Sequence, residues 1–317
     1  MRVLVTGADG FVGGFVVRAL LASGHEVIGT ERPGQAIRPA TLAEEERRAV
    51  RWQPLELGDL QSVRQAAQLD LDAVIHLAAV ASGGDALKDP GVAWAVNAAG
   101  TARLLNELGR RRAAGEGDPV VLLVSTAEVY GSEATRPLLE SDPVRPRSPY
   151  AASKAGAELA ARETAMRTGL KVIVARSFPH TGPGQDERFV APAFARRLRG
   201  ARLAKARIVK VGNLEPVRDI LDVRDVAAAY LALLERGTPG EVYNVCSGRG
   251  ISLRELFDRL AGVIGVDAIP ECDPEFLRPA DIAYLVGNPA KLVAATGWRP
   301  TFELDQTLRD LVDAQAD

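Results

Sequence analysis

The sequence predicts an α/β fold, a doubly wound and mainly parallel sheet with a smaller C-terminal lobe interleaved with it. Three observations support this prediction. Short apolar runs rich in Val and Leu alternate with segments of helical periodicity through the first half of the chain. Glycines cluster directly after the first of these runs. Beyond about residue 178, Pro and Gly become more frequent and the apolar runs become shorter.

Each short apolar run suits a strand buried on both faces of a sheet, because apolar residues follow one another without alternation. Strands are expected at residues 2–6, 26–30, 50–55, 73–77, 120–125 and 171–175, with a later strand at 243–245 returning to the same sheet. Helices are expected at residues 11–21, 94–111, 149–168 and 252–262, and the charged run 44–48 suits a solvated helix face or loop. Gly24 is placed to end the first helix, Pro149 suits a first turn, and Ser252 is a candidate N-cap.

These elements divide the chain into two lobes. Residues 1–177 are expected to form the first lobe, and residues 178–317 mainly the second, with segments near 212–247 returning to the first. A chain of 317 residues is longer than a single core usually organises, which also favours two closely packed lobes. We find no internal repeat and no low-complexity linker in the sequence.

Composition excludes several classes of protein. Hydrophobic residues make up 47% and charged residues 25% of the chain, which argues against disorder. The formal net charge is -2 with both signs interspersed, so we expect no nucleic-acid partner. The apolar stretches fall short of the roughly 20 residues that a membrane helix needs, so we expect no membrane partner.

The cysteines and the N-terminus predict a cytoplasmic protein. Cys246 and Cys272 lack CxxC spacing and are accompanied by only 3 histidines, so we expect free thiols and no metal site. The chain enters a predicted strand at Arg2, which leaves no room for a signal peptide.

Gly7, Gly10 and Gly13 form a G-x-x-G-x-x-G motif between the first strand and the first helix. A dinucleotide pyrophosphate requires a tight turn, backbone that can approach closely, and a helix N-terminus that favours negative charge. We therefore expect NAD(H) or NADP(H) to bind here. The same turn contributes Asp9, Phe11 and Val12 as candidate cofactor-binding residues.

Residues after the second, third and fourth strands are candidates for the rest of the cofactor site. Glu31 is placed to accept hydrogen bonds from the adenosine ribose, which favours NAD(H), whereas Arg32 could meet a 2′-phosphate. A surface pair of Glu31 and Arg32 is the structural alternative. Asp59, followed by Leu60, is placed to reach adenine, but it could equally be a helix cap. The small segment that closes the fourth strand contains Leu77, Ala78 and Ala79, where backbone can approach the cofactor; the preceding His76 suits a hydrogen-bonded core position better than a catalytic one.

Tyr150 and Lys154 form the motif that indicates catalysis. Residues at positions i and i+4 of a helix share one face, so the lysine ammonium should lie near the tyrosine hydroxyl and lower its pKa. Such a tyrosine can transfer the proton that accompanies hydride transfer at a carbonyl. Thr126, at the end of the fifth strand, is placed to hydrogen-bond the same oxygen.

Together these motifs resemble the extended short-chain dehydrogenases that modify nucleotide sugars. The resemblance is carried by residues 6–13, 76–79, 97–101, 125–131 and 150–154, and it covers essentially the whole chain. It implies a Rossmann-type domain, a C-terminal lobe that holds a nucleotide sugar, and a catalytic set of Thr126, Tyr150 and Lys154. It also implies a cofactor contact at Asn97, and a homodimer built through the helix at 94–111 and the catalytic helix.

Within that family, the second lobe most resembles the GDP-6-deoxy-D-mannose reductases, at residues 178–185, 211–219, 243–248 and 277–281. Those enzymes reduce the 4-keto group of GDP-4-dehydro-6-deoxy-D-mannose to give GDP-D-rhamnose. The resemblance implies that Arg218 and Arg278 grip the diphosphate, as a guanidinium can. Several relatives carry Asn where this chain has Pro179, so a polar substrate contact there is either lost or supplied by another residue, for which His180 is the candidate. Asn244 is expected to be structural.

Alternative reactions remain open. Many sugar-nucleotide 4,6-dehydratases place an Asp and a Glu directly after the catalytic Thr, whereas this chain has Ala127 and Glu128. Glu128 remains as a candidate for orienting the sugar. GDP-mannose dehydratases also have a different residue at the first position, which keeps that reaction possible. A 4-epimerase fits the second-lobe motifs less well, and a non-catalytic dinucleotide-binding regulator is disfavoured because Tyr150 and Lys154 are both present.

Overall fold

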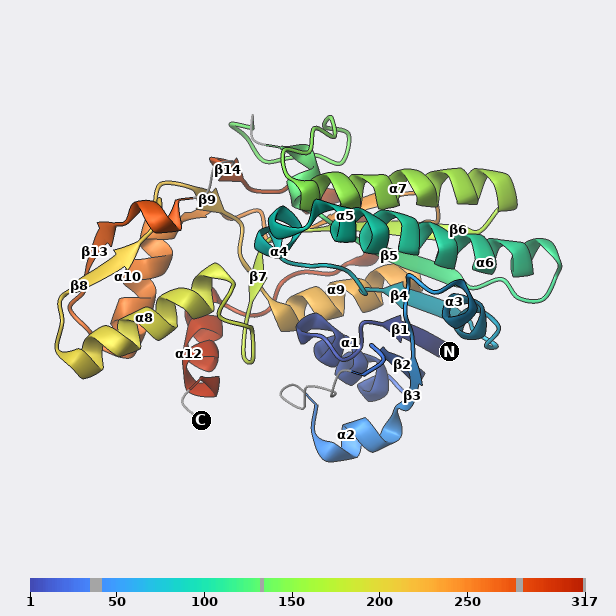
Figure 1. The fold of residues 1–317 in the computed structure, drawn as a ribbon, viewed down its shortest axis with the longest axis horizontal. Coiled ribbons are helices and arrows are strands. Elements are labelled where there is room, and N and C mark those ends of the chain that lie inside the picture. The colour runs from blue at the N-terminus through green and yellow to red at the C-terminus, as the bar shows by residue number, and fades with distance from the viewer. Residues whose placement is uncertain (35–41, 132–133, 278–281, 316–317) are drawn as a thin grey trace.

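The first lobe of the computed structural model is built on a seven-stranded parallel sheet (Figure 1). The structure describes residues 1–34, 42–131, 134–277 and 282–315. The strand order is β11-β6-β5-β4-β1-β2-β3. The strands are β1 (Arg2–Thr6), β2 (Glu26–Glu31), β3 (Arg51–Pro54), β4 (Ala73–His76), β5 (Val120–Thr126), β6 (Lys171–Ser177) and β11 (Val242–Val245). The predicted α/β fold is confirmed, and the order reverses between β1 and β4, where α/β sheets bind ligands beyond the strand ends.

Helices cover both faces of this sheet because successive strand residues point to opposite sides. Val3 and Val5 of β1 pack with α1 (Phe11–Ala22) and α9 (Val223–Arg236) in one buried cluster. Leu4, between them, packs with the helices of the other face. Those helices are α3 (Leu60–Ala67), α6 (Thr101–Ala113) and α7 (Pro149–Thr168).

The predicted helix at 94–111 is present, but its first part has a different geometry. Two short helices, α4 (Gly83–Lys88) and α5 (Pro90–Ala93), lead into a π-helical segment, Trp94–Gly100, which continues as α6. Gly100 lies at the junction, where a Cβ would come within 2.7 Å of the Leu57 Cβ atom. Wider π-helical turns often occur at functional sites, and this one contains Asn97.

The second lobe is smaller and is organised by three helices, α8 (Val190–Ala204), α10 (Leu253–Ile264) and α12 (Leu304–Ala314), which share a separate core. Three short sheets accompany these helices. One pairs β10 (Leu221–Asp222) with β7 (His180–Thr181), and another pairs β13 (Ile269–Cys272) with β8 (Ile208–Val211). The third has the order β12 (Ile251–Ser252), β9 (Val217–Arg218), β14 (Tyr284–Leu285). The other α-helices of the described residues are α2 (Glu44–Ala49) and α11 (Ala290–Thr296), and 3₁₀ helices lie at Ala127–Tyr130 and Pro274–Phe276. Both α9 and β11 belong to the first lobe, so the chain crosses between the lobes several times; a division at residue 177 stays a prediction.

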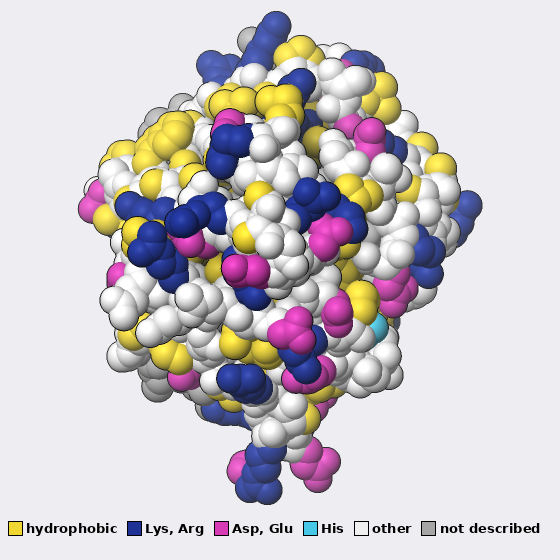
Figure 2. Space-filling view, turned by 90° about the vertical axis from the view of Figure 1, so that its right-hand side faces the viewer, with side chains coloured by type: hydrophobic (Ala, Val, Ile, Leu, Met, Phe, Trp, Pro, Cys, Tyr) yellow, Lys and Arg dark blue, Asp and Glu magenta, His cyan; other side chains and the backbone are white. Residues whose placement is uncertain are grey.

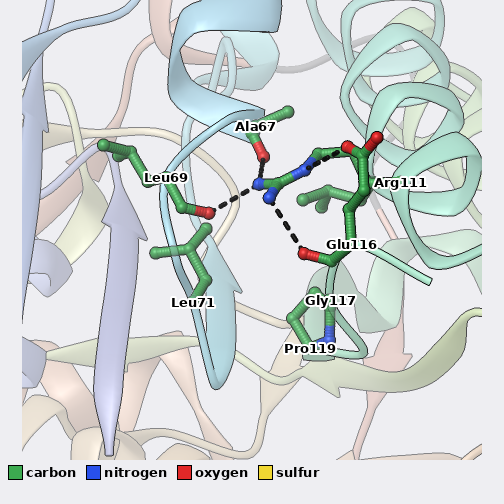
Figure 3. A pocket seen from close by; sticks show the side chains of 8 residues that line it. Ala67, Leu69, Leu71, Arg111, Glu116, Gly117 and Pro119 are labelled. Carbon is green, nitrogen blue, oxygen red and sulfur yellow. Dashed lines mark hydrogen bonds and ion pairs between the residues drawn. The ribbon is translucent and has the colours of Figure 1, made fainter. Parts of the chain in front are cut away.

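A small pocket between α3 and α6 receives an arginine side chain. Figure 3 shows the Arg111 guanidinium pointing into it, where Nη1 donates to the Ala67 and Leu69 carbonyl oxygens at 2.5 and 2.7 Å. These bonds satisfy carbonyl groups at and beyond the end of α3. Leu71 and Pro119 line the pocket and precede the first residues of β4 and β5. It therefore lies at the amino ends of the strands, at the opposite edge of the sheet from the glycine motif.

The surface carries both signs of charge. On the face shown in Figure 2, Lys and Arg side chains are interspersed with Asp and Glu side chains. Every helix in the described part of the chain is too short or too polar to span a bilayer. Both cysteines are free, with Cys246 buried and Cys272 exposed.

Candidate active site

The glycine motif forms a tight turn between β1 and α1. Gly7 has a φ of 70°, which favours glycine, and a Cβ there would lie 2.9 Å from the Ala78 backbone nitrogen. A Cβ on Gly13 would lie 2.2 Å from the Gly7 carbonyl oxygen. The turn therefore has the close backbone approach and close helix packing that a pyrophosphate site needs.

His76 of β4 connects β1 with α6 below this turn through two side-chain hydrogen bonds. Its Nδ1 atom hydrogen-bonds the Thr6 hydroxyl at 2.7 Å, and its Nε2 atom hydrogen-bonds the Thr101 hydroxyl at 2.9 Å. Burial, with a smaller effect from the Lys154 charge, lowers the pKa of His76 to about 3. His76 is therefore a neutral core residue with a hydrogen bond at each ring nitrogen, which is the role that the sequence favoured.

The acidic and basic candidates near β2 lie at the edge of the glycine turn. Gly7 donates its N–H to the Thr30 hydroxyl at 3.2 Å, which places the end of β2, and with it Glu31, beside the turn. The Arg32 backbone donates to Asp9 at 3.4 Å, and its side chain pairs with Glu56 at 3.5 Å. These positions suit an adenosine ribose, but a contact with it stays a prediction.

Asp59 is a helix cap in this structure. Its carboxylate accepts the Gln61 N–H at 2.9 Å at the start of α3, and Leu60 is the first residue of that helix. The capping role that the sequence left open is therefore present, and contacts of Asp59 and Leu60 with adenine stay predictions.

Asn97 ties the segment after β4 to the catalytic helix. Its side chain accepts the Val80 N–H at 2.8 Å and donates to the Val80 carbonyl at 3.1 Å, which fixes the loop that contains Leu77, Ala78 and Ala79. It also donates to the Ser153 hydroxyl at 2.9 Å, and Ser153 donates to the Tyr150 carbonyl at 2.8 Å. Sequence reasoning missed Ser153, although it stands directly before Lys154 in the motif.

Tyr150 and Thr126 meet at the carboxyl end of β5, and the Lys154 ammonium lies two residues further back on the same strand, at Val124. The Ser148 hydroxyl caps α7 by accepting the Ala151 N–H at 3.1 Å, so Tyr150 falls in the first turn of the helix. The Tyr150 hydroxyl hydrogen-bonds Thr126. The Lys154 side chain is buried, and its ammonium donates to the Val124 carbonyl at 2.5 Å.

The pKa of Tyr150 differs from the expectation. Burial raises it above its ordinary value, the charge of Glu128 raises it further, and the hydrogen bond from Thr126 partly opposes this. The expected lowering by Lys154 is wrong for the protein alone, because burial dominates and the ammonium is bonded to Val124. Burial also lowers the pKa of Lys154 to about 8, against the effect of Glu158.

Glu128 lies in the 3₁₀ turn Ala127–Tyr130 that follows β5. Its backbone N–H donates to the Thr126 hydroxyl at 3.2 Å, which helps to fix Thr126. Ala127 is fully buried in a small apolar cluster. The Tyr130 hydroxyl donates to Asn244 at 2.6 Å, and the Asn244 amide donates to the Leu138 carbonyl at 2.9 Å, so Asn244 has the structural role expected for it.

The second lobe reaches the glycine turn through His180. The His180 ring stacks on Phe11 with centroids 6.5 Å apart and an interplanar angle of 8°. Burial lowers the pKa of His180, so the imidazole is neutral at pH 7. The carbonyl of Pro179 accepts the Leu221 N–H at 2.9 Å, which is a backbone role that proline can fill.

Of the two arginines expected to bind the diphosphate, one lies within the described residues. Arg218 lies on β9, where its guanidinium donates to the Val217 carbonyl at 2.9 Å and to the Ile282 carbonyl at 2.5 Å. Arg278 lies outside the described residues. In the part of the chain that the structure describes, no group of His, Cys, Asp and Glu side chains is arranged to hold a metal ion.

Comparison with known proteins agrees with this geometry. The model of the GDP-mannose 4,6 dehydratase family matches residues 4–311. GDP-6-deoxy-D-mannose reductase of Pseudomonas aeruginosa is 37% identical over 314 residues, which are 98% of this chain and 96% of that protein.

Solved structures give the same result. The structure of RMD from Pseudomonas aeruginosa complexed with NADPH has a TM-score of 0.82 and 35% identity, covering 99% of this chain and 98% of that one. UDP-glucose 4-epimerase of Thermus thermophilus in complex with NAD has a TM-score of 0.84 and 32% identity, with the same coverage of 99% and 98%. The chain therefore belongs to the GDP-mannose 4,6 dehydratase family of extended short-chain dehydrogenases, which are NAD(P)-dependent enzymes of nucleotide sugars.

Proposed function

We propose that this enzyme reduces the 4-keto group of a GDP-4-dehydro-6-deoxy-hexose with NADH or NADPH, as a GDP-6-deoxy-D-mannose reductase that makes GDP-D-rhamnose. The observation that carries this proposal is the 37% identity to GDP-6-deoxy-D-mannose reductase over 98% of the chain. The positions of Tyr150, Thr126 and Lys154 support it, because they place a proton donor at the end of β5 and a cation two residues back on the same strand.

The glycine turn supports a dinucleotide site, since Gly7, Gly10 and Gly13 let the loop after β1 pack closely at the N-terminus of α1, where backbone N–H groups favour a pyrophosphate. The reduced nicotinamide, when bound, supplies the hydride. Tyr150 donates its proton to the carbonyl oxygen of the sugar, and its raised pKa keeps that proton available at neutral pH. Thr126 hydrogen-bonds the same oxygen. The buried Lys154 ammonium, held at Val124 on the same strand, would add a positive charge behind this site.

The remaining candidates would place the substrate. Arg218 and Arg278 would bind the diphosphate, which a guanidinium matches with paired hydrogen bonds. His180 would offer a polar contact to the sugar from beside the glycine turn, and Glu128 would orient its hydroxyl groups.

A second candidate reaction is a GDP-mannose 4,6-dehydratase, favoured by the family model that matches residues 4–311. That reaction needs an acid to protonate the departing hydroxyl. Ala127, directly after Thr126, is fully buried and cannot supply one. Glu128 is the acid that remains near Tyr150, as its effect on the tyrosine pKa indicates.

The experiment that separates these reactions offers the protein GDP-mannose and GDP-4-dehydro-6-deoxy-D-mannose in separate assays. Each assay contains either NADH or NADPH, and the products are identified by chromatography and mass spectrometry. We expect oxidation of the reduced cofactor only with the keto sugar. Conversion of GDP-mannose without added reductant would instead assign the dehydratase reaction, and no turnover of either sugar would contradict both.

We also propose that two copies of the chain associate through α7 and the segment that leads into α6. Leu159 and Met166 of α7 are 69% and 75% exposed, and Trp94 is 47% exposed. Apolar side chains gathered on neighbouring helices are typical of an interface. The mass of the particle in solution, measured by light scattering, tests this. Cytoplasmic localisation stays a prediction.

A further inference from the structure

A buried ion pair lies one helical turn beyond the catalytic lysine. Glu158 follows Lys154 on the same face of α7 as Tyr150, because residues four apart are neighbours on a helix. Arg176 of β6 donates to the Glu158 carboxylate at 2.8 Å through Nη2 and at 3.1 Å through Nε. The side chains of Arg176 and Glu158 are only 6% and 12% exposed.

The pair is joined to the same strand that holds the lysine. The Ser125 hydroxyl donates to Glu158 Oε1 at 2.5 Å, and Ser125 is the neighbour of Arg176 across β5 and β6. The next residue back, Val124, accepts the hydrogen bond of the Lys154 ammonium at 2.5 Å. Adjacent residues of β5 therefore hold the ammonium and the carboxylate.

We propose that Glu158 is a positioning residue for Lys154, and that its carboxylate, fixed by Arg176 and Ser125, keeps the buried ammonium charged and held at Val124 of β5. The inference rests on the proposed function in one respect, namely that a charged Lys154 serves the proton transfer from Tyr150.

Stabilisation of the fold is a weaker reason for burying this ion pair. A buried ion pair contributes little to stability compared with apolar residues of similar volume, because both charges lose their hydration. Lys154 has a different need, since burial lowers its pKa to about 8 and Glu158 is the charge that opposes this. A lysine that must remain cationic at neutral pH in such a place needs a nearby negative charge.

Charged and titratable groups around the pair come from several neighbouring elements of the described residues. His76 of β4 is neutral, since burial lowers its pKa to about 3. The Arg176 guanidinium lies 4.7 Å from the centroid of the Tyr130 ring and donates to the Glu140 backbone carbonyl at 3.3 Å. The Glu140 carboxylate accepts the Asn244 N–H at 2.8 Å. At the catalytic end, the titratable groups among the described residues include Tyr150, Glu128 and Tyr230, whose hydroxyl hydrogen-bonds Ser177 at the end of β6.

The test measures the pKa of Lys154 in the ligand-free protein. Lysine labelled with ¹³C is incorporated, the Lys154 Cε resonance is identified by its loss in Lys154→Arg, and its shift is followed with pH. In Glu158→Gln we expect the titration to move down by about one pH unit. Glu163→Gln is the matched control, because Glu163 lies on the same helix and pairs with the exposed Arg167.

Removal of Glu158 alone leaves Arg176 buried without its partner, which could prevent folding. The double variant Glu158→Gln with Arg176→Met removes both charges. We expect the pKa of Lys154 to fall here too, because Glu158 is the one that raises it. A Lys154 titration in the folded variants that matches the Glu163→Gln control would overturn the proposal.

Kinetics then connect the charge to the reaction. A lower Lys154 pKa removes the ammonium charge at lower pH, so the alkaline limb of kcat should move towards neutral pH in Glu158→Gln, whereas KM for the keto sugar should change little. Glu158→Asp should restore part of the shift, since it keeps the charge. An altered Lys154 titration in a protein that does not turn over the keto sugar would contradict the proposed function and leave this electrostatic role intact. A shifted titration with an unchanged kcat profile in an active enzyme would overturn the role of Glu158 in the reaction.

Discussion

Gly13 lies against Gly7 so closely that a methyl group on Gly13 would come within 2.2 Å of the Gly7 carbonyl oxygen and 2.7 Å of the Ala8 Cα atom. The first turn of α1 therefore packs directly on the loop that leaves β1. A side chain at position 13 would not fit this contact, and the turn that Gly13 supports is the one that we predict to accept the pyrophosphate.

The first prediction concerns this contact. Gly13→Ala should push α1 away from the turn, lower the free energy of unfolding by about 2 kcal/mol and weaken dinucleotide binding by more than tenfold. Gly262→Ala is the control, because a Cβ there meets nothing within 4 Å, and it should stabilise α10 slightly. Denaturant unfolding and cofactor titration by fluorescence measure both effects. Unchanged cofactor affinity in Gly13→Ala would show that the turn is not the binding site.

The second prediction concerns the proton donor. Tyr150→Phe keeps the ring but removes the hydroxyl that bonds Thr126, so kcat for the keto sugar should fall about 100-fold to 10,000-fold. The dissociation constant of NADPH should change little, because the phenol is needed for proton transfer more than for cofactor binding. Tyr284→Phe on β14 is the matched control. A Tyr150→Phe enzyme with near-normal turnover would remove Tyr150 from the mechanism.

Most of the first lobe could be predicted because its local signals agree with one another. β1 (Arg2–Thr6) and α7 (Pro149–Thr168) have the predicted bounds, since Gly7 and the Ser148–Pro149 pair mark their ends clearly. Strands with less clear ends differ by a residue or two, as in β3, predicted over 50–55 and found at Arg51–Pro54. The π-helical form of Trp94–Gly100 could not be predicted, because the sequence pattern of an α-helix and of a π-helical turn is the same here, and the close packing of Gly100 on Leu57 appears only in the fold.

The catalytic site could be predicted only in part. The spacing of the motif places Tyr150 and Lys154 on one face of the helix. It does not reveal how deeply the fold buries the Tyr150 hydroxyl, and this burial is what raises the pKa of Tyr150. The ion pair of Glu158 and Arg176 joins a helix to a strand, and neither residue belongs to a motif that indicates catalysis or cofactor binding. The role of Asp59 was open in the sequence, because a cap and a ligand contact require the same residue type at the same place.

The third prediction follows from the lowered pKa of Lys154. The folded protein releases the lysine proton near pH 8, whereas the unfolded chain keeps it until about pH 10.5. Because the unfolded state binds more protons in this window, the contribution of Lys154 to stability should rise with pH between about 8 and 10.5. Lys154→Met should remove that rise, and Lys88→Met, an exposed lysine, should keep it. Urea unfolding at several pH values provides the measurement, and equal slopes in wild type and Lys154→Met would contradict the prediction.

The last prediction concerns His76 and acid. Its pKa is about 3 in the folded protein against 6.5 in the unfolded chain, because the imidazole is buried between Thr6 and Thr101. The unfolded state therefore binds more protons between these values, and stability should be lost as the pH falls through about 6.5 towards 3. His76→Gln cannot be protonated and should lose about 2 kcal/mol less than wild type between pH 6.5 and pH 5. Parallel curves for His76→Gln and wild type would mean that other groups account for acid sensitivity, whereas a shallower curve would identify the buried imidazole as a main cause.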